Sequence, residues 1–147
     1  MPNICLTFGT HVASTNIQLA LTTLEGLANW WTNDTKGNPA EGGELVFTFG
    51  NNGGFVMRVL KSTAEQVQWQ CIQGPDEWLG THIEFELVQQ PNHCQLMFRH
   101  SGWAAEVPFF YHCSTKWATF LLSLRDYVEQ GQGRPFPDDL KIEAQGM

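Results

Sequence analysis

The middle of the chain alternates apolar and polar residues through five successive segments, and this pattern constrains the fold more than any other feature. The segments lie near residues 45–49, 55–59, 67–71, 81–87 and 94–100, and turn-forming sequences separate them. Strict alternation places successive side chains on opposite faces of a strand. Short connections between such strands favour antiparallel pairing. The pattern therefore predicts an antiparallel sheet with one apolar and one polar face.

The apolar face of this sheet is rich in large side chains and must be covered by another layer. A long helix after Pro108 matches it, because its apolar residues recur at helical spacing up to a Gly131 stop. The helix stripe is Cys113, Trp117, Phe120, Leu121, Leu124 and Val128; the sheet face is Leu45, Phe47, Phe49, Phe55, Met57, Val59, Val67, Trp69, Ile83, Phe85, Leu87, Leu96 and Phe98.

The N-terminal part adds a strand over 4–8, two short helices within 14–31 and a loop over 33–43. Grouped strands with helices at the ends predict an α+β fold. We expect a curved antiparallel sheet of about six strands around the long C-terminal helix, with the two short helices after the first strand. Residues 1–147 are expected to form a single domain, with 131–147 as a C-terminal loop or tail.

Composition narrows the class of partner. The 147 residues carry 8 Lys and Arg against 15 Asp and Glu, a net charge of -7. A phosphate-backbone binder needs a basic face, so nucleic acid is not an expected partner. No apolar run approaches the roughly 20 residues that span a bilayer. The first residues show no secretory signal pattern, so we expect a cytoplasmic location.

Several phrases in this order resemble one known family. They are Leu27–Thr32, Phe47–Gly50, Trp78 before Gly80–Phe85, Phe98–Trp103, and Ser123–Tyr127 after Cys113 and Trp117. Together they resemble the START-like (SRPBCC, Bet v-like helix-grip) superfamily. Within it, the chain is similar to bacterial homologues of the activator of the 90-kDa heat-shock protein ATPase, the Aha-type branch. The resemblance covers nearly the whole chain.

The resemblance implies a deep pocket between the sheet and the C-terminal helix, which the superfamily uses to hold apolar or amphipathic molecules. Some members of the superfamily catalyse reactions there, with residues that vary between branches. On this basis and on the expected inward faces, the pocket is predicted to be lined by Trp31, Phe47, Phe49, Met57, Trp69, Phe85, Phe98, His100, Cys113, Trp117 and Leu121.

Two of these residues raise the alternative of an enzyme. His100 could exchange a proton near neutral pH, but a buried histidine with hydrogen-bond partners is the favoured interpretation. Cys113 begins the long helix, where a thiol can become reactive, yet an apolar packing role is favoured. His82, Glu84 and Glu86 could bind a metal, but a solvated outer strand face explains them better, so no metal is expected.

The sequence has no cofactor motif: the glycines at 53–54 lack the Lys-Ser/Thr and the following helix of a phosphate loop. The favoured hypothesis is a module that binds an apolar or amphipathic small molecule, its identity open. An enzyme that uses the same pocket and a co-chaperone-like interaction domain are the alternatives. A homodimer is also left open.

Overall fold

The computed structural model describes residues 1–143, and for Asn52 the backbone only. The predicted C-terminal loop therefore has its last four residues outside the described part. The elements in chain order are β1 (Ile4–Thr10), α1 (Ser14–Thr22), α2 (Leu24–Trp30), β2 (Asp34–Gly37), β3 (Glu44–Thr48), a 3-10 turn (Gly50–Asn52), β4 (Gly54–Ser62), β5 (Gln66–Gln73), β6 (His82–Gln90), β7 (His93–Ser101) and α3 (Pro108–Gln130).

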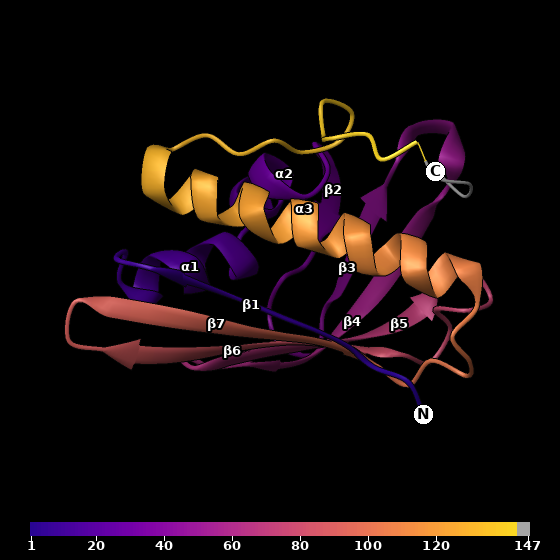
Figure 1. The fold of residues 1–147 in the computed structure, drawn as a ribbon, viewed down its shortest axis with the longest axis horizontal. Helices are drawn as coiled ribbons and strands as arrows, with labels where there is room; N and C mark the ends of the chain where they lie inside the picture. The colour runs from indigo at the N-terminus through magenta and orange to yellow at the C-terminus, as the bar shows by residue number, and fades with distance from the viewer. Residues whose placement is uncertain (144–147) are drawn as a thin grey trace.

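The strands form one antiparallel sheet in the order β1-β7-β6-β5-β4-β3-β2, and α3 lies across its inner face (Figure 1). This arrangement confirms the predicted α+β helix-grip fold. The sheet has seven strands where about six were predicted. The additional strand is β2, four polar or small residues that pair only with β3 at the sheet edge. Its sequence lacks apolar alternation, which is why the prediction placed it in a loop.

The predicted apolar face is buried throughout. Every one of its thirteen residues, from Leu45 to Phe98, is at most 8% exposed. Cross-strand pairing brings Phe85 opposite Phe98 and Trp69 opposite Ile83, so the aromatic side chains interlock on the inner side. On the outer side Glu84 lies opposite Arg99, which keeps that face polar.

The long helix α3 has the predicted limits. Some of its polar side chains, outside the predicted apolar stripe, are also buried. Pro108 stands in its first turn, and Gly131 ends it in the left-handed conformation (φ 81°), with its N–H donating to the Tyr127 carbonyl at 2.8 Å. Lys116 and Ser123 are also buried. Polar side chains on a helix are buried when another segment covers them and supplies partners.

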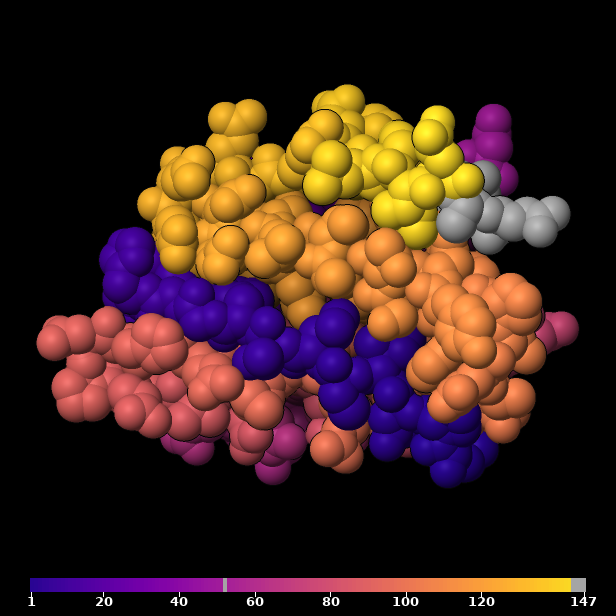
Figure 2. Space-filling view, viewed as in Figure 1, coloured from indigo at the N-terminus to yellow at the C-terminus, as the bar shows by residue number. Residues whose placement is uncertain are grey.

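That segment is residues 131–143, here called the C-terminal strap, which runs back along α3 (Figures 1 and 2). Its Arg134 N–H donates to the Ser123 hydroxyl oxygen at 2.6 Å. The Phe136 N–H donates to the Trp31 carbonyl at 2.8 Å, and the Phe136 carbonyl accepts from Asn33 at 3.1 Å. The strap is thereby held to both α3 and the segment after α2.

The four cysteines are free thiols. Three of them are buried, whereas Cys5 is exposed because it alternates onto the outer face of β1. Within the described residues, none of the helices has both the length and the apolar character needed to cross a membrane.

Candidate functional site

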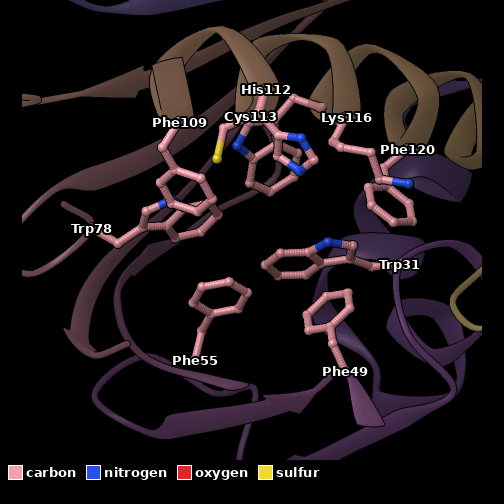
Figure 3. A pocket seen from close by; sticks show the side chains of 10 residues that line it. Trp31, Phe49, Phe55, Trp78, Phe109, His112, Cys113, Lys116 and Phe120 are labelled. Carbon is pink, nitrogen blue, oxygen red and sulfur yellow. The ribbon is translucent and has the colours of Figure 1, made fainter. Parts of the chain in front are cut away.

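The candidate site is a pocket between the N-terminal half of α3, the β3–β4 hairpin and the loop that joins β5 to β6 (Figure 3). Trp31, which follows α2, also contributes to the lining. Rings dominate the lining, so the pocket surface is almost entirely apolar. The ten lining residues are Trp31, Phe49, Phe55, Trp78, Phe109, His112, Cys113, Lys116, Trp117 and Phe120.

Aromatic packing nearly closes this pocket. Trp78 stacks on Phe55 with ring centroids 4.2 Å apart, and Trp31 contacts Trp117 at 4.9 Å. The remaining cavity has a volume of about 20 Å³. That is room for one water molecule, well below the size of a typical ligand site. The large pocket implied by the resemblance is thus filled by the protein's own rings.

Four of the eleven predicted pocket residues line this cavity: Trp31, Phe49, Cys113 and Trp117. The other seven are buried in the core but do not line this cavity. Strand parity predicts which side chains point inward, but it gives no information on where along the sheet an opening lies. These seven are Phe47, Met57, Trp69, Phe85, Phe98, His100 and Leu121.

Six lining residues were not predicted. Phe55 and Phe120 were assigned to the core, and Trp78 and Phe109 belong to a loop and to a helix start, where periodicity is uninformative. His112 and Lys116 precede Phe120 at intervals of four residues along α3. This i, i+4, i+8 spacing places them on one face of the helix and is the signal that could have found them.

His100 is held by hydrogen bonds on both sides of its ring. The Trp117 indole N–H donates to His100 Nδ1 at 3.1 Å, so the proton resides on Nε2. Nε2 lies 2.8 Å from the Thr81 hydroxyl, which donates in turn to the Trp78 carbonyl at 2.6 Å. Burial lowers the pKa of His100 to about 3. The residue is therefore a neutral connector between α3, β7 and the β5–β6 loop.

Cys113 has the properties of a packing residue. Burial raises the pKa of its thiol to about 12; a weak hydrogen-bonding interaction with the Trp78 side chain lowers that pKa, and the charge of Glu77 raises it. A thiol of this kind is not ionised at neutral pH and is a poor nucleophile. The described residues show no hydrogen bond between Cys113 and His100, whose ring nitrogens are already occupied. A Cys–His catalytic pair is not assembled.

Two polar side chains of the lining lack hydrogen bonds. Within residues 1–143, neither the indole nitrogen of Trp78 nor either ring nitrogen of His112 has a partner. Both residues are buried, with 4% and 3% of their surface exposed. Burial, together with the nearby Lys116 charge, lowers the pKa of His112, so its ring is neutral at pH 7.

Lys116, the charged residue of the lining, is paired with the strap. Its ammonium donates to the Asp139 carboxylate and, at 2.7 Å, to the Leu140 carbonyl. Lys141 also contacts Asp139, at 2.8 Å. Burial acts to raise the pKa of Asp139, but the hydrogen bonds and charges of the two lysines outweigh it and hold that pKa below its ordinary value. The charge of Lys116 is thus compensated within the protein.

Metal ligation finds no support in the described part of the chain, where no group of three or more His, Cys, Asp or Glu could hold an ion. His82, Glu84 and Glu86 lie on the outer face of β6, because they alternate along the strand with the buried Ile83 and Phe85.

Comparisons with known proteins agree with this architecture. The family model described as "Activator of Hsp90 ATPase homolog 1-like protein" matches residues 18–129. No curated protein matches the chain. The solution structure of the Aha1 dimer from Colwellia psychrerythraea is 40% identical, over 90% of this chain and 100% of that chain, with a TM-score of 0.83.

Two more distant structures share the fold. Protein MLL2253 from Mesorhizobium loti is 16% identical over 88% of this chain and 98% of that chain, with a TM-score of 0.76. The crystal structure of CalU16 from Micromonospora echinospora is 15% identical over 88% of this chain and 75% of that chain, with a TM-score of 0.73. The family match, the identity to the Colwellia protein and the helix-grip architecture together show that the chain belongs to the Aha-type family of activator of Hsp90 ATPase homolog 1-like proteins, within the START-like fold.

Proposed function

We propose that the chain binds a small apolar or amphipathic molecule in the aromatic pocket beneath α3. The observation that carries this proposal is the lining itself: seven phenyl or indole side chains surround a small cavity beneath α3. Ligand sites are predominantly apolar with a few placed polar groups, and Trp78 and His112 are polar groups of that kind. Among the described residues, no comparable feature supports a co-chaperone-like role.

Binding in this pocket requires side chains to move, because about 20 Å³ accommodates no organic molecule. Two lining residues stand on segments at the margin of the packed core. Phe109 is half-buried in the first turn of α3, and Trp78 stands on the β5–β6 loop between Gly74 and Gly80, which both have positive φ. We therefore expect the ligand to enter between these two residues and to replace their contacts with its own.

Filling the cavity should abolish binding, and Cys113→Met is the variant that does so. The longer thioether adds two heavy atoms to an apolar position that already faces the void, so the fold should be retained. Toluene, titrated into the protein and followed by amide chemical-shift changes, is expected to bind the wild type and to lose at least about tenfold in affinity in the variant.

The matched control is Ala118→Met, on the same helix but outside the lining. Its toluene affinity should equal that of the wild type. If Cys113→Met binds toluene as well as the wild type does, the pocket is not the site. Native mass spectrometry of the freshly purified protein complements this titration: a discrete mass lost on denaturation would identify a co-purified ligand.

We further propose that the chain acts as one domain in the cytoplasm and forms a homodimer. The 40% identical protein from Colwellia is described as a dimer, and its whole length aligns with 90% of this chain. Light scattering coupled to size-exclusion chromatography is expected to give twice the mass of one chain. A mass equal to one chain, unchanged at high concentration, would contradict the dimer.

A further inference from the structure

The pocket lining contains two buried polar side chains, Trp78 and His112, whose nitrogens have no full hydrogen bond, and apolar packing does not explain them. A buried N–H without an acceptor costs the free energy of the lost hydrogen bond, and such groups are rare in folded proteins. Trp78 and His112 both line the same small cavity and are at least 96% buried. The Trp78 indole N–H interacts weakly with the thiol of Cys113, which also lines the cavity; sulfur is a poor acceptor, so this contact does not replace a full hydrogen bond.

We infer that Trp78 and His112 form a polar hook that selects an uncharged aromatic molecule bearing a carbonyl or hydroxyl oxygen. The inference rests on the proposed binding function and specifies its ligand. An oxygen acceptor would take the Trp78 N–H, which can only donate. Neutral His112 offers one N–H and one lone pair, so it can bind either a carbonyl or a hydroxyl group. The rest of the ligand would stack among the rings shown in Figure 3.

The charges around the pocket exclude an ionic ligand. Lys116 already donates to Asp139 and to the Leu140 carbonyl, so an incoming carboxylate would have to displace a buried partner. Glu77, whose charge acts on Cys113, adds repulsion toward an anion. A cation would meet the Lys116 ammonium, which itself lies 4.9 Å from the Phe120 ring centre and occupies the cation–π position.

The experiment compares toluene with acetophenone, which keeps the ring and adds a carbonyl. Because acetophenone is also better solvated in water, the informative quantity is the change in affinity between protein variants for each probe. Trp78→Phe and His112→Phe are each expected to weaken acetophenone binding about tenfold, the factor that 1.4 kcal/mol gives, and to leave toluene within about twofold. Both variants keep an aromatic ring at the position.

Trp103→Phe is the matched control. Its indole nitrogen is also buried without a partner, but Trp103 does not line the pocket. This variant should bind both probes as the wild type does. Benzoate and N,N,N-trimethylanilinium, the charged counterparts, are expected to bind the wild type at least about tenfold more weakly than acetophenone.

A second measurement avoids reliance on variants that could disturb packing. In a ¹⁵N–¹H spectrum of the tryptophan indoles, the Trp78 signal is identified by its absence in Trp78→Phe. That signal should move downfield with acetophenone and much less with toluene, because only acetophenone accepts its hydrogen bond.

The outcomes separate this inference from the function on which it rests. If both probes bind and neither probe's affinity responds to Trp78→Phe or His112→Phe, the pocket stands and the hook is wrong. Benzoate that binds as tightly as acetophenone would overturn the exclusion of charged ligands. If toluene and acetophenone both fail to bind the wild type, the proposed function fails and the hook fails with it.

Discussion

Replacing Asp139 with Asn should lower the free energy of unfolding by about 3–5 kcal/mol, the effect expected when one partner of a buried ion pair is removed. The Lys116 and Asp139 side chains are only 7% and 4% exposed. Without the carboxylate, the Lys116 ammonium would stay buried with only neutral acceptors, the amide oxygen introduced at position 139 and the Leu140 carbonyl, beside the Phe120 ring. Urea unfolding followed by tryptophan fluorescence measures the change.

The origin of this effect can be separated from simple loss of packing. Lys116→Met combined with Asp139→Leu removes both charges and should be less destabilised than Asp139→Asn alone, because no uncompensated charge remains. Lys141→Ala is the control: it removes an exposed partner of the same carboxylate and should cost less than about 1 kcal/mol. An Asp139→Asn loss below about 1 kcal/mol would show that Lys116 reaches water in the native state.

Acidification should destabilise the protein through His100. Its pKa is about 3 in the folded chain against 6.5 for an unperturbed histidine, so the unfolded chain binds the extra proton. Stability is therefore complete above pH 6.5 and decreases as the pH falls. The expected loss is about 2 kcal/mol between pH 7 and pH 5, rising to roughly 4–5 kcal/mol near pH 3. Urea midpoints across this pH range measure it.

His100→Gln separates this contribution from those of other groups. The amide can replace both hydrogen bonds of the ring but does not titrate. Its unfolding free energy should depend less on pH between 5 and 7, with the remaining slope due to His112, whose lowered pKa has the same sign. Asp139 contributes only at lower pH, since its pKa lies below its ordinary value. Equal slopes for the variant and the wild type would contradict a buried, neutral His100.

Much of the fold follows from local patterns. Alternation from Leu45 to Phe98 predicts the inner face of the sheet, and the helical stripe from Cys113 to Leu124 predicts which side of α3 packs on it. The prediction missed β2, which forms because β3 offers an unpaired edge to a polar segment. Strand formation of this kind depends on the neighbour and has no sequence period of its own.

The site was less accessible to prediction, because a cavity is a property of three-dimensional packing. Phe55 and Trp78 close the pocket by stacking on each other, although Phe55 lies on β4 and Trp78 lies in the β5–β6 loop. The burial of Lys116 depends on Asp139, 23 residues later in a segment without periodicity. Local patterns identified Phe49, Cys113 and Trp117, and the i, i+4 spacing of His112, Lys116 and Phe120 carried further information about the pocket.

The pairing of β1 with β7 has a consequence for how the chain folds. Ile4 lies opposite His100 and Phe8 opposite Leu96, so β1 has no partner until most of the chain has left the ribosome. Contacts this distant in sequence require a large loop to close first, which slows folding. During synthesis the five strands from β3 to β7 can pair through local hairpins. The segment that forms β1 stays unpaired and exposed over this time. Of the seven strands of this sheet, β1 precedes the others along the chain yet can pair only once β7 is present, and its unpaired edge is exposed to aggregation in that interval.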